Sequence, residues 1–188
     1  FIENGLGQAN CPNTDQFFKA VRFLRAIQIK GGLNLIYRVN NGVDELVISF
    51  LDRYKDTARG VIEDTTNRKE WLPKDSYGDL GKWANFQEAV NYAQLMNQIY
   101  AGGQSDWRLP NKEEILDLYN EKLIQKDWEG NEIHIAPVFL TGCSHYLWSS
   151  EKNKDGQYMR IDLRNGDPEY IDAQDREHQA VRLIRNKI

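Results

Sequence analysis

The sequence predicts an α+β fold in which two helices pack on a small twisted antiparallel sheet. Two observations lead to this prediction. Two stretches with apolar residues at helical spacing each begin with a capping signal, and Trp107-Arg108-Leu109-Pro110 joins them. The last third of the chain alternates apolar and polar residues up to Asn165-Gly166, a pair that is typical of a tight hairpin turn.

The composition is that of a globular protein. The chain has 188 residues, 28% of them charged and 40% hydrophobic, with a formal net charge of -4. This length allows a substantial core, and the near balance of charge favours neither nucleic acid nor an anionic membrane as a partner. No apolar stretch approaches the roughly 20 residues of a membrane helix. The chain begins at Phe1, so we expect an upstream piece, with any export signal, to have been removed.

Residues 1–58 are predicted to form an N-terminal extension of unknown role. Apolar residues at near-helical spacing predict a helix over residues 15–31. Residues 33–51 predict a β-hairpin, because two strand-like stretches flank Asn40-Asn41-Gly42. This extension could pack onto the later domain or onto a partner.

The two cysteines leave two alternatives open. Cys11 and Cys143 are too far apart in sequence to form a CxxC redox or metal pair. They could form one disulfide between the extension and the later domain, which would imply an oxidising compartment. Both could equally be unpaired thiols.

The first of the two main helices is predicted to start after Asn85. Glu88 follows three residues later, which is the pattern of a capping box that satisfies free backbone N–H groups. Gly102-Gly103 is expected to end the helix. The buried stripe is expected to comprise Phe86, Ala89, Val90, Ala93, Met96 and Tyr100.

The segment between the two helices is predicted to form a rigid elbow. Pro110 disfavours helical geometry in the residue before it, and Asn111 is placed to cap the second helix with Glu114. We expect the indole of Trp107 to pack between helices and sheet, and Arg108 to bond carbonyls or a carboxylate of the elbow. The buried stripe of the second helix is expected to include Ile115, Leu118 and Tyr119.

A long loop is predicted over residues 126–144, because this segment holds few periodic apolar residues. After it, the strict alternation of residues 158–164 predicts a strand with Met159, Ile161 and Leu163 facing the core. A two-residue turn at Asn165-Gly166 would place Asp162 opposite Glu169. The side chains expected on the exposed face of this hairpin are Tyr158, Arg160, Asp162, Arg164, Asp167 and Glu169.

Signals for metal binding and catalysis are lacking in the sequence. His134, His145 and His178 do not have the spacing of a zinc site, and we expect surface or hydrogen-bonded structural roles for them. No nucleophile elbow, phosphate-binding loop or dinucleotide glycine pattern occurs. We therefore expect no cofactor and no enzymatic activity.

Several stretches carry a family resemblance. They are Gly60–Leu72, Phe86-Gln87-Glu88-Ala89, Ser105–Asn111, Tyr146-Leu147-Trp148-Ser149-Ser150 and Gln179–Arg185. In this order they resemble the Lcl C-terminal domain of the Legionella collagen-like adhesin, a family similar to C-type lectins and formylglycine-generating enzymes. Lys69-Glu70 before Trp71 departs from the family pattern. The resemblance implies a C-type-lectin-like domain over residues 59–188, with the closing strand beside the opening one. The residues expected to support this fold are Trp107, Arg108, Pro110 and Trp148.

The resemblance implies a non-enzymatic adhesin or ligand-binding module at the cell surface, in the envelope or secreted, with a cytoplasmic location as the alternative. Its expected ligand is a glycan, including anionic glycosaminoglycans, or a protein partner, and it implies a homo-oligomer, a trimer. The expected contacts are the six exposed hairpin residues. The same residues could instead form a solvated strand face with cross-strand ion pairs.

The sequence leaves two other functions open. A structural or assembly subunit, such as an appendage tip or phage-type receptor-binding protein, would use the extension for docking. An enzyme similar to formylglycine-generating enzymes would need a copper-binding cysteine pair, whereas residues 59–188 contain only Cys143. Calcium-dependent sugar binding is not expected, because Asp167-Pro168-Glu169 has the wrong residue order for the lectin loop.

Overall fold

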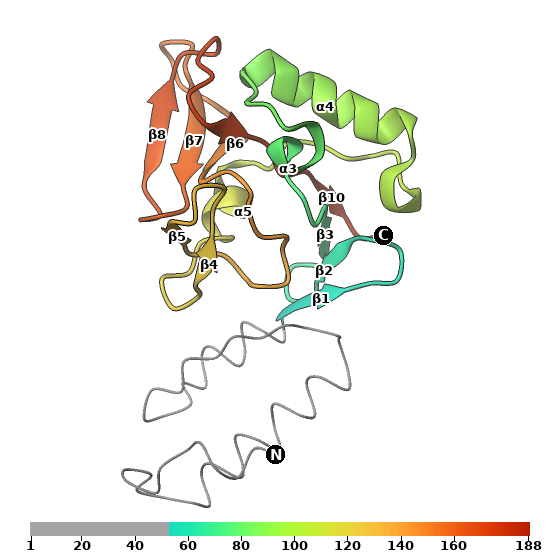
Figure 1. Ribbon diagram of the computed structural model, residues 1–188. Coiled ribbons are helices and arrows are strands. Elements are labelled where there is room, and N and C mark those ends of the chain that lie inside the picture. The colour runs from blue at the N-terminus through green and yellow to red at the C-terminus, as the bar shows by residue number, and fades with distance from the viewer. Residues whose placement is uncertain (1–52) are drawn as a thin grey trace, which may run out of the picture. The chain divides into compact units, whose positions relative to one another are not determined.

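The computed structural model describes residues 53–188, which all belong to one compact unit of the chain (Figure 1). The described helices are α3 (Ser76–Leu80), α4 (Phe86–Gln98), the 3-10 helix η1 (Ala101–Gly103) and α5 (Lys112–Leu116). The strands are β1 (Tyr54–Asp56), β2 (Ile62–Asp64), β3 (Lys69–Trp71), β4 (Gln125–Lys126), β5 (Glu132–Ile133), β6 (Tyr146–Lys152), β7 (Tyr158–Asp162), β8 (Pro168–Ile171), β9 (Gln179–Ala180) and β10 (Ile184–Asn186). The fold is mixed α+β and is dominated by short strands.

Several predictions lie outside the described residues. They are the helix over residues 15–31, the hairpin over residues 33–51 and the state of Cys11. Within the described part of the chain, Cys143 is a free and buried cysteine. No helix of residues 53–188 is long and apolar enough to cross a membrane.

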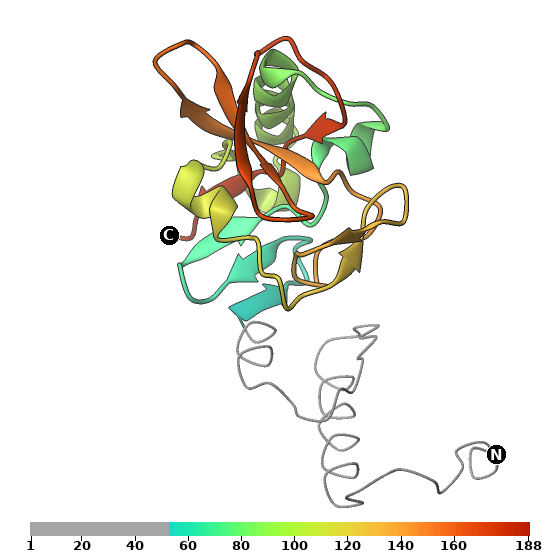
Figure 2. The same cartoon turned by 90° about the vertical axis from the view of Figure 1, so that its left-hand side faces the viewer.

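The first sheet has the strand order β1-β2-β3-β10. Its strands are antiparallel, and β10 pairs with β3 so that Ile184 lies opposite Trp71. The closing strand therefore lies beside the opening pair, as predicted. Because β1 starts at Tyr54, the sheet begins upstream of the boundary expected after residue 58. Views along two directions place β1 and β2 at one end of the domain and α4 at the other (Figure 2).

The second sheet has the order β8-β7-β6-β9, and its β7–β8 hairpin differs from the prediction. Arg160, not Asp162, lies opposite Glu169. The predicted register was wrong because the turn is wider than two residues: the Asp162 N–H donates to the Asp167 carbonyl at 3.0 Å. Gly166, at φ 83°, closes the turn with a 2.7 Å hydrogen bond from its N–H to the Asp162 carbonyl. The observed register sets opposite charges, rather than like charges, across the hairpin.

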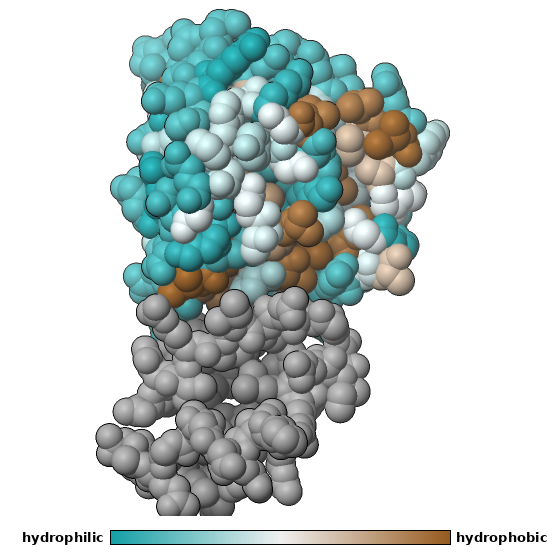
Figure 3. Space-filling model, in the orientation of Figure 1, coloured by the Kyte–Doolittle hydropathy of each residue, from teal (hydrophilic) through white to brown (hydrophobic). Residues whose placement is uncertain are grey.

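Both helix caps were predicted correctly. The side chain of Asn85 accepts from the Glu88 N–H at 2.9 Å, and Glu88 accepts from the Asn85 N–H at 3.0 Å. The burial predicted for Tyr100 was wrong, since this side chain is 65% exposed. The reason is that α4 ends at Gln98 and Tyr100 has a left-handed φ of 52°. Apolar surface is visible near α4, where Leu95 and Ile99 are also exposed (Figure 3).

The elbow between α4 and α5 is built as predicted. Trp107 is 2% exposed, and its indole N–H donates to the Ala101 carbonyl at 2.9 Å. The Asn97 side chain bonds both the N–H and the carbonyl of Trp107, which holds the elbow against α4. Arg108 donates to both carboxylate oxygens of Glu114 at 2.7 Å. This paired contact connects the elbow to the first turn of α5.

Residues 126–144 form a largely irregular segment, as predicted. They include the end of the β4–β5 hairpin, and they bury Ile133, Ile135 and Phe139 in the core. Phe139 packs edge-to-face against Tyr54 and Trp71, with ring centroids 5.3 and 6.5 Å apart. The burial of these three residues was not predicted, because they are irregularly spaced and periodicity cannot indicate their burial.

Candidate ligand-binding groove

The hairpin face predicted to contact a ligand is not a free surface. Arg160 is 8% exposed and Asp162 is 5% exposed. The guanidinium of Arg160 lies 3.6 Å from the ring centroid of Tyr146 on β6 and pairs with Glu169 at 2.7 Å. The prediction that both residues face solvent was therefore wrong. The alternation of polar residues along β7 correctly indicates which side chains share one face of the strand. Long side chains on the neighbouring strands lie over that face and cover it.

The other residues of that face mainly contact one another. Tyr158 stacks on Phe86 at 3.5 Å, with an angle of 17° between the rings. Arg164, whose side chain is 40% exposed, donates to the Asp162 carboxylate and to the Tyr146 hydroxyl. Burial alone would raise the pKa of Asp162, but hydrogen bonds from Arg164 lower it. The cross-strand ion pair of the alternative is thus present as Arg160 with Glu169, but the face is not solvated, since Arg160 and Asp162 are buried and only the turn residues Arg164 and Asp167 are exposed.

Two further residues expected to support the fold are buried. Trp148 is 0% exposed and donates its indole N–H to the Ala84 carbonyl at 2.8 Å. Pro110 is buried at the elbow, and its carbonyl accepts from the Ser150 N–H at 2.8 Å. Trp148 and Pro110 therefore connect β6 to the helical half of the domain.

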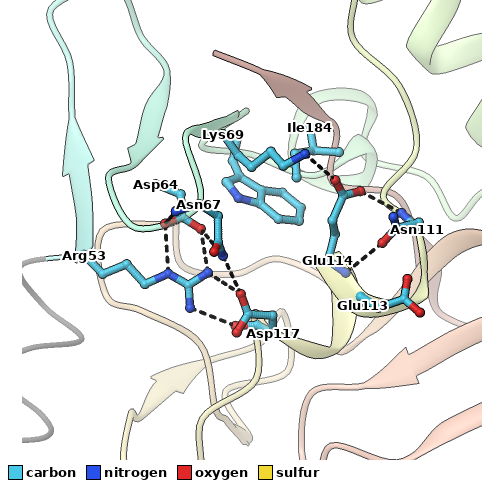
Figure 4. Close-up of a pocket in the computed structure, with 10 residues that line it drawn as sticks. Arg53, Asp64, Asn67, Lys69, Asn111, Glu113, Glu114, Asp117 and Ile184 are labelled. Carbon is cyan, nitrogen blue, oxygen red and sulfur yellow. Dashed lines mark hydrogen bonds and ion pairs between the residues drawn. The ribbon is translucent and has the colours of Figure 1, made fainter. Parts of the chain in front are cut away.

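A different hollow lies between α5 and the first sheet, and we call it the α5 groove (Figure 4). Its volume is about 590 Å³. Trp71 and Ile184 are almost fully buried and form an apolar floor, while polar side chains form the walls. An apolar base with a few placed polar groups is typical of ligand sites. The groove is lined by Arg53, Asp64, Asn67, Lys69, Trp71, Asn111, Glu113, Glu114, Asp117 and Ile184.

Arg53 holds one side of the groove together. Its guanidinium donates to both carboxylate oxygens of Asp64, at 2.9 and 2.5 Å, and to the carboxylate of Asp117. The Asn67 amide donates to the same two carboxylates at 3.2 and 2.8 Å. Burial alone would lower the pKa of Arg53, but Asp64 and Asp117 outweigh that effect and raise it. Arg53 therefore stays charged.

The carboxylate of Asp64 also organises the β2–β3 turn. It accepts the backbone N–H groups of Thr66 and Asn67 at 3.0 and 3.1 Å. Burial would raise the pKa of Asp64, but the bonds from Arg53 and from the backbone lower it. A single ionised aspartate thus fixes both the turn and the position of Arg53.

Glu114 organises the opposite side of the groove. Asn111 caps α5 through reciprocal 2.9 Å bonds with Glu114, and the Glu114 carboxylate also binds Arg108. Lys69 lies 3.0 Å from the same carboxylate and donates to the Asn186 side chain at 2.6 Å. Partial burial would raise the pKa of Glu114, but the bonds from Arg108, from the Asn111 backbone and from Lys69 lower it to about 2.

Two groups in the groove have no bonding partner among residues 53–188. The indole N–H of Trp71 is buried without a hydrogen-bond acceptor, although Trp71 is only 2% exposed. A buried donor of this kind is uncommon and calls for an explanation such as a bound water or ligand. The exposed side chain of Glu113 makes no hydrogen bond or ion pair within the described part of the chain. Of these two groups only the Glu113 carboxylate is accessible from outside, because the Trp71 nitrogen is fully buried.

The sequence patterns did not indicate the groove as a ligand site. Its residues come from four separate stretches between Arg53 and Ile184, and only the fold brings them together. Two partial signals were present: Trp71 within the opening strands, and the cap formed by Asn111 and Glu114. Each of these signals correctly indicates an element of secondary structure, but neither indicates that the residues meet around one cavity.

The histidines have the structural roles that were expected. His145 is buried and its Nδ1 lies 3.1 Å from the Asp127 carboxylate, while His134 Nδ1 lies 2.8 Å from the Leu123 carbonyl. Burial lowers the pKa of His145, and nearby Arg164 lowers it further. Among residues 53–188, no group of three or more histidine, cysteine, aspartate or glutamate side chains could hold a metal ion.

His178 belongs to a cluster of partly exposed rings outside the groove. Tyr77 stacks on Trp83 at 3.9 Å, and Trp128 approaches Trp83 edge-on at 5.0 Å. The ring of His178 lies 5.2 Å from that of Trp83 and 5.1 Å from that of Trp128. Because the centroids are so close, the rings pack against one another and do not surround a cavity.

The family comparison agrees with this structure. A family model described as Lcl C-terminal domain matches residues 60–185. No curated protein and no solved structure matches the chain. The matched range includes both helix caps, the elbow, the closing strand up to Arg185 and every groove residue except Arg53. A match over about two-thirds of the sequence means that this chain belongs to the Lcl C-terminal domain family.

Proposed function

We propose that this domain is a non-enzymatic, adhesin-type binding module with a C-type-lectin-like fold, and that it holds a glycan in the α5 groove. The observation that carries the proposal is the groove itself, in which rigid polar walls surround an apolar floor formed by Trp71 and Ile184. Membership of the Lcl C-terminal domain family supports an adhesin-like role. We further propose display at the cell surface, in the envelope or outside the cell.

The chemistry of the walls suits hydroxyl groups. A sugar hydroxyl both donates and accepts, so it binds best where donors and acceptors alternate. The exposed amides of Asn67 and Asn111, the ammonium of Lys69 and the carboxylates of Glu113 and Asp117 provide both kinds of group. Hydrogen bonds already hold several of these side chains in place, which reduces the entropy lost on binding.

The state of the carboxylates supports binding rather than glycoside hydrolysis. Hydrolysis needs a protonated acid whose pKa is raised toward the working pH. The pKa of Glu114 is instead lowered to about 2, and Asp64 and Asp117 are paired with Arg53. Groups that stay ionised near neutral pH can accept hydrogen bonds, but they cannot donate a proton to a leaving group.

A glycan array tests the proposal with two variants. Asn67→Ala removes an exposed amide from the groove wall and is expected to weaken glycan binding about fivefold to fiftyfold. Asn91→Ala is the matched control, because Asn91 is an exposed asparagine on α4 outside the groove. Equal loss in both variants, or no glycan bound by the wild-type chain, would contradict the proposal.

A second candidate is a structural or assembly subunit. Three exposed side chains at the end of α4 favour it: Leu95, Ile99 and Tyr100 are 40%, 60% and 65% exposed. Neighbouring apolar side chains on a surface are typical of protein contacts. Light scattering after size-exclusion chromatography would detect the fixed oligomer, such as a trimer, that this function requires, whereas a monomer would contradict it.

A further inference from the structure

The Asn165-Gly166 turn carries a chemical reactivity that ligand binding does not use. In an Asn–Gly pair the backbone nitrogen of glycine can attack the asparagine side chain, because glycine has no side chain of its own to hinder the approach. We propose that Asn165 is a deamidation site that the native β7–β8 hairpin keeps closed, and that opening of the hairpin exposes it to reaction. This inference does not depend on the proposed ligand.

The reaction needs only the chain and water. The backbone nitrogen of Gly166 forms a bond to the side-chain amide carbon of Asn165, and the bond from that carbon to the amide nitrogen breaks. The amide nitrogen leaves as ammonia and takes the proton of the Gly166 N–H, so that a five-membered succinimide ring remains. Water then opens the ring at either carbonyl, which gives aspartate or isoaspartate at position 165. No electrons are transferred, so no oxidant or reductant is required.

The native turn holds the attacking nitrogen in place. The Gly166 N–H donates to the Asp162 carbonyl at 2.7 Å, and this bond must break before the nitrogen can lose its proton and turn toward the Asn165 side chain. Gly166 also packs against Tyr119, since a Cβ atom at position 166 would lie 2.7 Å from a carbon of the Tyr119 ring. The ring therefore restricts movement of the backbone at Gly166.

The asparagine side chain is held as well. Its Oδ1 accepts from the Asp167 N–H at 3.0 Å, a local bond that is typical of asparagine in turns. An attack on the amide carbon requires the side chain to rotate, which would break this second bond. Asn165 is exposed, so water already reaches it. The site is therefore closed by the conformation of the turn and not by burial.

Opening of the hairpin would remove these restraints together. The turn is closed by β7 and β8, where Arg160 pairs with Glu169 across the strands at 2.7 Å. Folded proteins open locally at a lower free-energy cost than that of global unfolding. The rate of deamidation should therefore equal the rate in an unfolded chain multiplied by the fraction of time for which the hairpin is open.

The test follows deamidation of the full chain in mildly alkaline buffer by peptide mapping and mass spectrometry, with and without concentrated urea. The chain has Asn–Gly pairs at Asn4, Asn41 and Asn165, and in urea all of them should react at similar rates. We expect Asn165 to react about tenfold to a thousandfold more slowly in the native chain than in urea. Equal rates at Asn165 with and without urea, or no reaction there in urea, would overturn the proposal.

Glu169→Ala tests whether the hairpin is the gate. The variant removes the anion that pairs with Arg160, so Asn165 in the native variant should react about threefold to thirtyfold faster, while the rate in urea stays the same. Glu114→Gln is the control, because it removes a charged contact of α5 outside the hairpin. If Glu169→Ala does not fold, Glu169→Gln takes its place, and the same direction of change is expected. Equal acceleration by the hairpin variant and the control, or none by either, overturns the proposal, because the hairpin then does not control the reaction.

Discussion

Glu114 stabilises the domain only while it is ionised. Its pKa is lowered to about 2 in the folded state, against about 4.3 for glutamate in an unfolded chain. The shift corresponds to at most about 3 kcal/mol of stability, and solvent screening reduces it. That contribution is fully present above about pH 4.5. It is lost as the pH falls toward 2, because the unfolded chain takes up the proton first.

Glu114→Gln tests this pH dependence. In urea unfolding at about pH 7, the variant should be less stable than the wild type by about 1 to 3 kcal/mol. The difference should become smaller as the pH is lowered to about 3, because the wild type then loses the same interaction. Glu121→Gln serves as the control and should match the wild type throughout. A difference that stays constant with pH would show that ionisation of Glu114 is not the cause.

At the scale of elements, the β7–β8 hairpin depends on an ion pair set by its register. Glu169 faces Arg160 across the hairpin, and Arg160 is 8% exposed. Glu169→Ala would leave a largely buried guanidinium without its anion, so we expect a loss of about 1 to 3 kcal/mol in unfolding free energy. Asp167→Ala changes an exposed carboxylate in the same turn and should cost less than about 0.5 kcal/mol. Similar losses in both variants would contradict this explanation.

Elements defined by local chemistry could be predicted from the sequence, and elements defined by distant contacts could not. Asn85 and Asn111 each lie three residues before a glutamate, so both caps could be predicted without tertiary information. The pairing of Arg160 with Glu169 depends on a turn whose width is set by Gly166 and by contacts with other strands. The burial of Phe139 depends on Tyr54 and Trp71, which lie far from it in sequence.

At the scale of the whole molecule, the candidate site could not be predicted because it does not exist in any single segment. Trp71, Glu114 and Ile184 meet only after β10 has paired with β3 and α5 has packed beside them. The sequence favours the hairpin face instead, because its polar residues alternate within one strand. Alternation identifies a face of a strand, but it cannot show what covers that face.

The family-matched range is expected to be too short to form the groove. Residues 60–185 omit β1 and Arg53, and would leave the Asp64 carboxylate buried without its cation. Breaking a buried pair in this way costs about 3 to 5 kcal/mol. We expect a fragment of residues 60–185 to unfold at a lower urea concentration than a fragment of residues 53–188, and to lose glycan binding. Equal stability and binding of the two fragments would contradict this.

Arg53 connects the start of the first sheet to the groove. It stands directly before β1, and its guanidinium also neutralises the groove carboxylates Asp64 and Asp117. Mechanical tension on the chain at Arg53 would therefore act on one wall of the groove, through the Arg53 side chain and through its carbonyl, which accepts hydrogen bonds from Thr65. Pulling that side chain away would expose Asp117 and make the groove more negative. On the function that we propose, force applied at Arg53 would therefore alter ligand binding in the groove.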